Sequence, residues 1–181
     1  MGGMMKHEQA CRIAEGVASI LEPECERIAI AGSIRRGKPE VKDIEIVVIP
    51  KTRVVKDMFK LPITFSALEQ YPWSLIGKLV LDGPRQKKIR LYEGIALDLY
   101  IVLPPAQWGV IYTIRTGPAD FSQWVVTPRK KGGALPSSSK VSEGRVLEYG
   151  KPLAMGEEID FLNYLGLGWI EPEERRPMWK K

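Results

Sequence analysis

The spacing of apolar residues along the chain predicts a series of short helices and strands. Apolar residues at helical spacing indicate helices, and alternating or continuous apolar runs that end at Gly or Pro indicate strands. In the first half of the chain, these patterns predict a helix over 6–21, strands over 28–30, 43–49, 88–92 and 95–103, and a short helix over 65–71. In the second half, they predict helices over 106–114, 118–126 and 157–165, and a small hairpin over 145–153.

Pro104 and Pro105 end the last of the predicted strands and mark the expected boundary between two lobes. Strands dominate before this boundary and helices after it, which is typical of an α+β fold. We therefore expect two domains, one over 1–105 and one over 106–181. A chain of 181 residues can bury most of its surface without a disulfide or a structural metal.

Composition excludes several classes of protein. The only histidine is His7, so a Ser-His-Asp triad, a Cys-His pair or a histidine-rich zinc site is not expected. Cys11 and Cys25 form no Cys-x-x-Cys pair and indicate the reduced, buried thiols of an intracellular protein. No apolar run approaches the roughly 20 residues of a membrane-spanning helix, so no membrane partner is expected. The net charge of +5 makes polyanions the first partner class to consider.

Three acidic residues lie on two of the predicted strands. Asp43 and Glu45 are two positions apart, so their side chains point to the same face of the strand. Asp98 stands between Leu97 and Leu99, where an unpaired charge is costly. If the two strands are neighbours, the three carboxylates converge on an oxygen-ligand site suited to Mg²⁺. The alternative is that Asp43 and Glu45 lie on a solvated face and that Asp98 pairs with an arginine.

A short glycine-rich segment follows the first predicted strand. Gly32 and Ser33 enter a helical turn in which backbone N–H groups and a hydroxyl can face a phosphate. Arg36 can add a bidentate contact, and Gly37 lets the chain leave the turn tightly. Such turns are also common in loops that bind nothing. Followed by paired acids and a third acid, however, the turn describes two-metal phosphoryl transfer, in which metal ions neutralise a triphosphate and activate a hydroxyl.

These residues carry a resemblance to a known family. The string Gly-Ser-Ile-Arg-Arg-Gly at 32–37, followed after five residues by Asp-Ile-Glu at 43–45, resembles the signature of the nucleotidyltransferase fold, in the form found in family X DNA polymerases, the DNA polymerase beta group. The likeness covers nearly the whole chain. It continues through 96–101, 109–117, 131–132, 150–153, 157–161 and 165–172, and through Arg175.

The resemblance implies a catalytic palm over 1–105, with a mixed sheet and helices on one face, and a C-terminal lobe over 106–181 that binds the nascent base pair. It implies that Asp43, Glu45 and Asp98 bind two Mg²⁺ ions, for which Mn²⁺ can substitute, and that Asp98 helps to deprotonate the primer 3′-hydroxyl. The residues that it assigns to the incoming nucleotide are Gly32, Ser33, Arg36, Lys42, Arg115, Thr116, Gly117 and Ser122.

The sequence departs from the family pattern at several of these positions. The family usually has Asp where Glu45 stands, a glycine where Lys42 stands, and an asparagine that reads the minor groove where Ser122 stands. Arg115 belongs to a pair that replaces two aromatic residues beside the nucleotide sugar, so we expect weak discrimination between dNTP and rNTP, unless Arg115 faces solvent or pairs with Asp120. The DNA-binding and lyase domains of larger members are absent from the sequence, so we expect a reduced polymerase that resembles the compact viral members.

Basic residues gather near the third acidic residue and again after residue 128. The residues expected to contact DNA phosphates are Lys87, Lys88, Arg90, Arg129, Lys130 and Lys131. Each cluster, taken separately, is equally consistent with a solvated face that binds nothing.

The leading hypothesis is a DNA polymerase that adds dNMP from dNTP to a primer 3′-hydroxyl and releases pyrophosphate, in short-gap or repair synthesis. We expect an intracellular monomer, in a cytoplasm or nucleoid or associated with a virus, that binds primer-template or gapped DNA. One alternative is a template-independent nucleotidyltransferase acting on RNA, protein or a small molecule. Another is a module that binds nucleic acid or nucleotide without turnover. The likeness to the family in the C-terminal segments, from 131–132 to 165–172, argues against the first alternative, and the three carboxylates argue against the second.

Overall fold

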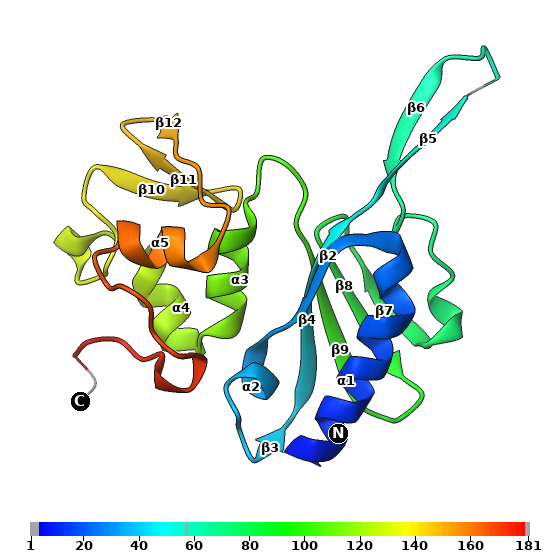
Figure 1. The fold of residues 1–181 in the computed structure, drawn as a ribbon, viewed down its shortest axis with the longest axis horizontal. Helices are drawn as coiled ribbons and strands as arrows, with labels where there is room; N and C mark the ends of the chain where they lie inside the picture. The colour runs from blue at the N-terminus through cyan, green and yellow to red at the C-terminus, as the bar shows by residue number, and fades with distance from the viewer. Residues whose placement is uncertain (1–3, 57, 180–181) are drawn as a thin grey trace. The chain divides into compact units, whose positions relative to one another are not determined.

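The computed structural model describes residues 4–56 and 58–179, which form two compact units (Figure 1). Unit 1 comprises the chain up to residue 30 and residues 40–101, and unit 2 comprises residues 31–39 and the chain from residue 102 onward. The boundary after residue 101 therefore falls close to the one expected at Pro104 and Pro105. The segment 31–39, expected in the first domain, groups with unit 2.

Unit 1 is built on a five-stranded sheet. Its strands, in spatial order, are β2 (Cys25–Ile30), β4 (Asp43–Pro50), β9 (Ala96–Ile101), β8 (Gln86–Leu91) and β7 (Gly77–Asp82). β4 and β9 run parallel, and the other neighbouring strands run antiparallel, so the sheet is mixed. Together with the helices described below, this sheet confirms the expected α+β fold class.

One long helix packs on this sheet. α1 (His7–Leu21) contacts β2 and β4, as the helical spacing of its apolar residues predicts. Its buried residues are Ala10, Ala14, Val17 and Leu21. The fully buried branched side chains of β4 and β9 include Ile44, Ile46, Leu97 and Leu99. Because side chains alternate along a strand, the acidic residues between these positions lie on the other face of the sheet.

A second, two-stranded sheet follows β4 along the chain. β5 (Thr52–Lys56) and β6 (Pro62–Ser66) form an antiparallel hairpin that reaches away from the five-stranded sheet (Figure 1). The helix expected over 65–71 is wrong, because residues 62–66 form a strand and 67–69 a turn. Cross-strand pairs such as Val55 with Ile63 favour the ladder, and this pairing overrides the helical spacing of the apolar residues that follow.

The remaining elements of unit 1 are small. They are β1 (Met5–Lys6), paired with β3 (Glu40–Val41), and the 3₁₀ helices η1 (Glu22–Glu24) and η2 (Trp73–Leu75).

Unit 2 combines helices with a small sheet. Its elements are α2 (Gly32–Arg35), α3 (Trp108–Thr116), α4 (Ala119–Val126), η3 (Arg129–Lys131), β10 (Ser139–Ser142), β11 (Arg145–Glu148), β12 (Lys151–Pro152), α5 (Glu158–Tyr164) and η4 (Pro172–Glu174). The core includes Val110, Phe121, Trp124, Phe161 and Leu162. The three longer helices and the hairpin confirm the expected elements, whereas strand β10 was not expected.

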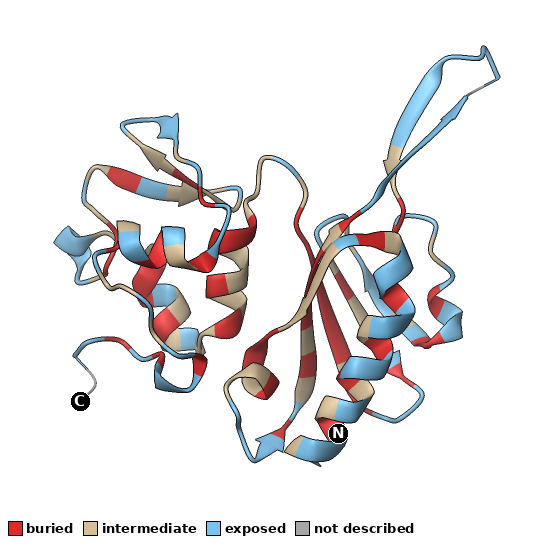
Figure 2. Ribbon diagram, in the orientation of Figure 1, coloured by how far each residue is buried: buried red, intermediate tan, exposed pale blue. Residues whose placement is uncertain are grey.

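The burial of residues in unit 1 differs between the sheet, the helix α1 and the hairpin (Figure 2). The strands at the centre of the five-stranded sheet are largely buried, and α1 has buried residues along one face and exposed residues along the other. The β5–β6 hairpin is exposed over almost its whole length. No helix among residues 4–56 and 58–179 has the length and apolar character needed to span a membrane.

Candidate functional site

The three predicted carboxylates share one face of the sheet in unit 1. β4 and β9 are parallel neighbours in a register that places Glu45 directly opposite Asp98, and Asp43 opposite Ala96. Residues paired in this way point to the same face, and residues two positions apart on one strand do so too. The condition for convergence, that the two acidic strands are neighbours, is therefore met. Asp98 is only 6% exposed, whereas Asp43 and Glu45 are half-buried.

Asp98 has basic and polar partners on the adjacent strand β8. Lys88 lies opposite Asp98 in the antiparallel register, and its Nζ is 3.2 Å from Asp98 Oδ2. Gln86 Nε2 donates a hydrogen bond to Asp98 Oδ1 at 3.4 Å. The buried carboxylate is thus compensated by a cation of the same sheet, which is a lysine rather than an arginine.

The carboxylates fit a divalent cation in donor type and in position on the sheet. Neighbouring strands are about 4.8 Å apart, and alternate residues of one strand about 6.6 Å, which are spacings that carboxylates can bridge around an ion. In their present rotamers they do not form a coordination shell. Among the described residues, no group of three or more His, Cys, Asp or Glu side chains is arranged to hold a metal ion.

The glycine-rich segment of unit 2 forms a single turn of helix, α2. Gly32 has φ of +60° and Gly37 has φ of +64°, a backbone conformation that only glycine adopts without strain. Between them, Arg36 N–H donates to Gly32 O, and Lys38 N–H donates to Ser33 O. The Ser33 Oγ is buried and makes no hydrogen bond to any residue that the structure describes. An unpaired buried hydroxyl is unfavourable, so Ser33 is suited to a ligand that bonds with it.

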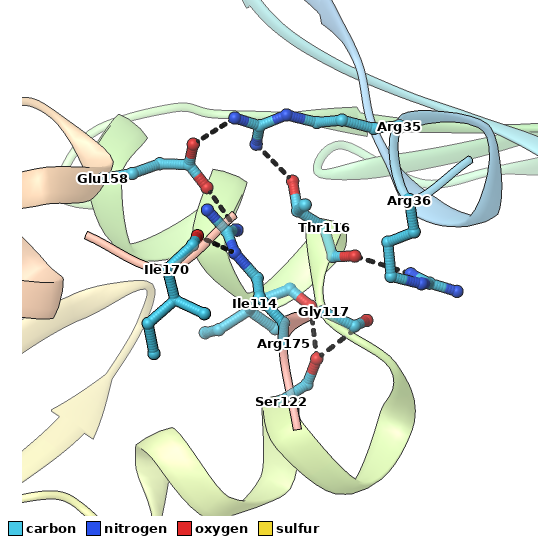
Figure 3. A network of polar contacts seen from close by, with 9 residues as sticks. All are labelled: Arg35, Arg36, Ile114, Thr116, Gly117, Ser122, Glu158, Ile170 and Arg175. Carbon is cyan, nitrogen blue, oxygen red and sulfur yellow. Dashed lines mark hydrogen bonds and ion pairs between the residues drawn. The ribbon is translucent and has the colours of Figure 1, made fainter. Parts of the chain in front are cut away.

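The two arginines of this segment contact the end of helix α3, which also lies in unit 2 (Figure 3). Arg36 Nη1 donates to the Thr116 carbonyl at 2.5 Å, and Arg35 Nη1 donates to Thr116 Oγ1 at 2.7 Å. The Arg35 guanidinium also lies over the Tyr112 ring, 4.1 Å from its centroid. Arg36 and Thr116, which the resemblance assigns to the incoming nucleotide, are therefore linked directly.

A buried carboxylate anchors the same network. Glu158, the first residue of α5, accepts from Arg35 Nη2 at 2.6 Å and from Arg175 Nη1 at 2.7 Å. The Arg175 side chain is fully buried, and its Nε donates to Ile170 O at 3.3 Å. Neither Arg35 nor Glu158 was among the expected site residues. The sequence carries no signal that distinguishes Glu158 from its exposed neighbour Glu157, because both stand at the start of the same helix.

The Thr-Gly turn between α3 and α4 is held by Ser122. Its Oγ lies 2.5 Å from Ile114 O and 3.2 Å from Gly117 O, so this hydroxyl is engaged with the backbone of its own turn (Figure 3). A Cβ at Gly117 would lie 2.4 Å from a ring carbon of Phe121, which explains the glycine. Arg115 is half-buried on α3.

Some of the residues expected to contact DNA have side chains engaged within the protein, and others are simply exposed. Lys87 is 5% exposed, forms an ion pair with Asp82 and lies 5.6 Å from the Trp73 ring centroid, so its ammonium group is engaged within the protein. Arg129 is exposed, but its guanidinium donates to the carbonyls of Ala134 and Leu165. Arg90, Lys130 and Lys131 are exposed, as is Lys42.

The cysteines do not add a nucleophile to the site. Cys25 is buried in β2, and burial, with a smaller contribution from Glu24, raises the pKa of its thiol to about 11. The thiol is therefore protonated at neutral pH.

The sequence matches no protein-family model and has no significant match among curated proteins.

Proposed function

We propose that the chain is a DNA polymerase that adds dNMP from dNTP to a primer 3′-hydroxyl and releases pyrophosphate. One observation carries the proposal, namely the register of β4 and β9. It places Glu45 opposite Asp98, with Asp43 on the same face, although the two strands are separated by more than forty residues of chain. Like charges this close on one face repel, so a purely structural sheet normally avoids them. A site that binds divalent cations and polyphosphate does gain from them.

Asp43, Glu45 and Asp98 would hold two Mg²⁺ ions, since their oxygen donors suit this cation. When bound, the ions neutralise the triphosphate and lower the pKa of the attacking hydroxyl. In the reaction, the primer 3′-oxygen forms a bond to the α-phosphorus, the bond from this phosphorus to the pyrophosphate oxygen breaks, and the hydroxyl proton leaves. The Asp98 carboxylate is the candidate acceptor for that proton, once Lys88 has moved away from Oδ2.

Two features of unit 2 favour a nucleotide as the substrate. The Ser33 hydroxyl, which has no hydrogen-bond partner among the described residues, can bond to a phosphate oxygen, and Arg36 supplies positive charge. The Arg36 guanidinium is held by the Thr116 carbonyl at one nitrogen, which orients the group before a ligand arrives. These groups would bind and position the β- and γ-phosphates.

A second candidate function is nucleotide addition without a template. The Ser122 hydroxyl is the observation that favours it, because it is bonded to Ile114 O and Gly117 O rather than offered to a base pair. The Ser122 hydroxyl proton is therefore not available to donate to the minor groove of a nascent base pair, the role that the resemblance gives to this position.

Extension of a labelled primer tests both functions. The substrates are gapped, recessed and single-stranded DNA, each with Mg²⁺ or Mn²⁺ and one dNTP at a time. Incorporation of only the complementary dNMP supports the polymerase, and addition of any dNMP supports the template-independent enzyme. Asp98→Asn should be inactive, and Glu26→Gln, an exposed acid on β2 of the same sheet, serves as the matched control. Full activity of Asp98→Asn would refute both functions.

A further inference from the structure

The β5–β6 hairpin exposes more large apolar side chains than a surface element needs. Six of them are between 48% and 87% exposed: Val54, Val55, Met58, Phe59, Leu61 and Ile63. A two-stranded ribbon has no second layer that could cover them. Contiguous apolar surface of this kind in a soluble protein marks an interaction site.

Apolar residues lie on both strands of the hairpin and at its turn. Val55 is paired with Ile63 and Arg53 with Phe65, so these four side chains share one face, and Met58, Phe59 and Leu61 extend the apolar surface to the tip. Met58 and Phe59 are the most exposed of the set, at 87% and 75%. The tip is therefore the part of the hairpin most available to a partner.

Positive charge is interleaved with this apolar surface. The segment 51–66 contains four basic residues and one acidic residue, a net charge of +3. At the base of the hairpin, Arg53 pairs with Glu24 at 2.5 Å, and Lys51 Nζ donates to Pro23 O at 2.8 Å. These contacts fasten the base to unit 1. Lys56 and Lys60, both exposed, flank the tip.

This pattern of charge selects among possible partners. Lys60 stands between Phe59 and Leu61, so insertion of the tip into a lipid bilayer would bury its ammonium group in hydrocarbon. The core of a protein–protein interface is depleted of lysine for the same reason. Two copies of the hairpin would each bring +3 and repel one another. A nucleic acid suits both the lysines and the apolar side chains of the hairpin, since its phosphates attract lysines and its unstacked bases accept apolar side chains.

We propose that the hairpin binds DNA at a point where stacking is interrupted, such as a gap or a primer terminus. Met58 and Phe59 pack against the exposed base, and Lys56 and Lys60 contact the phosphates on either side of it. Apolar side chains placed between base steps are a known means of holding a kinked or interrupted duplex. The inference rests on the proposed function only for the choice of DNA, and it requires no catalysis.

Binding measurements without dNTP test the inference separately from the reaction. The variant Met58→Ser/Phe59→Ser removes the apolar tip, and both residues are too exposed for their replacement to unfold the protein. Val80→Ser, an exposed apolar change on β7, is the matched control. We expect the tip variant to bind gapped DNA about tenfold more weakly than the wild type, by fluorescence anisotropy, because base stacking contributes strongly to such contacts. Binding to blunt duplex should change by less than about twofold, because a blunt duplex offers no interrupted stack.

A fluorescent base analogue gives a second readout. With 2-aminopurine at the gap, the wild type should change the fluorescence on binding, and the tip variant should not. Lys56→Ser/Lys60→Ser should weaken binding and reduce its salt dependence, while leaving the fluorescence change of the bound complex intact. Unchanged affinity of the tip variant for gapped DNA would overturn the inference. Tip-dependent binding to phosphatidylserine vesicles, or tip-dependent dimerisation in sedimentation, would overturn it too.

The outcomes separate this inference from the proposed function. Tip-dependent binding to gapped DNA without any incorporation would leave the hairpin site standing and refute the polymerase. Incorporation that does not depend on Met58 and Phe59, with unchanged binding to gapped DNA, would support the polymerase and refute the hairpin site.

Discussion

Lys88 on β8 and Asp98 on β9 are directly opposite each other and form an ion pair, with Nζ 3.2 Å from Oδ2. Asp98 is nearly fully buried, whereas the Lys88 side chain is 41% exposed, so the lysine is the mobile partner. Asp98, which we propose as a metal ligand, is thus paired with a lysine of the same sheet. The pair compensates the buried charge, and under the proposed function a divalent ion would have to displace Lys88 from Asp98.

Removal of this lysine should strengthen metal binding. In Lys88→Met, a divalent ion no longer competes with the ammonium group, and we expect Mn²⁺ alone to bind about fivefold more tightly, since a half-exposed ion pair contributes about 1 kcal/mol. Titration of Mn²⁺ by electron paramagnetic resonance, without nucleotide, measures this. Arg90→Met, on the same strand and exposed, is the control. An unchanged Mn²⁺ affinity would show that Lys88 does not guard the site.

The three carboxylates should differ in their effects on stability, although we expect replacement of any one of them to abolish incorporation. Asp43→Asn and Glu45→Gln relieve repulsion on the shared face, so we expect the melting temperature without metal to rise. Asp98→Asn breaks the pair with Lys88, so we expect no such rise. Glu45→Asp should retain activity, because it keeps the charge. Melting curves with and without Mn²⁺ measure the differences, and a metal-induced rise in Asp43→Asn equal to that of the wild type would contradict the assignment.

The buried triad of unit 2 should be important for stability. Glu158→Gln leaves Arg35 and the fully buried Arg175 without their shared carboxylate, so we expect the free energy of unfolding to fall by about 3–5 kcal/mol. Urea denaturation measures it, with the exposed Glu173→Gln as control. A decrease below about 1 kcal/mol would mean that water or another group compensates the arginines.

Ser33 should separate stability from ligand binding. Ser33→Ala removes a buried hydroxyl that has no partner in the described part of the chain, so we expect the free energy of unfolding to stay equal or to rise by about 1 kcal/mol. The same change should weaken binding of dNTP, measured by isothermal titration calorimetry. Ser19→Ala, exposed on α1, should change neither quantity. If Ser33→Ala lowers stability and leaves the dNTP affinity unchanged, the hydroxyl has a structural role instead.

The basic residues after α4 should contribute to DNA affinity through charge alone. Lys130→Ala/Lys131→Ala should flatten the log–log dependence of affinity on salt by about 0.9 for each phosphate that is no longer neutralised. Lys87→Met should leave the slope unchanged and lower stability, because this lysine is buried against Asp82 and Trp73. Anisotropy titrations at several salt concentrations measure the slope. An equal slope in the double variant and the wild type would exclude these two lysines from the DNA interface.

Local pattern was sufficient for several features of the chain. The common face of Asp43 and Glu45 follows from the two-residue period of a strand, and the helix α1 follows from the spacing of its apolar residues. The glycines at 32 and 37 lie at positive φ, as expected for a tight turn. These features depend on neighbours within a few residues, so a short window of sequence contains their cause.

Long-range pairing decided the rest. Asp98 lies opposite Glu45 because β9 is the neighbour of β4 in the sheet. Lys88 compensates Asp98, and Lys87 is buried, because the two lysines point to opposite faces of β8. Glu158 is buried, unlike Glu157, because two arginines bind its carboxylate. One is Arg35, more than a hundred residues earlier in the chain, and the other is Arg175.

Strand β6 extends to Ser66, into the stretch 65–71 where the sequence suggested a helix, because the residues of the two strands find their partners across the turn rather than along one helical face. Each of these outcomes depends on contacts between separate segments of the chain. The free energies of such contacts exceed the small differences in local propensity that a short stretch of sequence expresses.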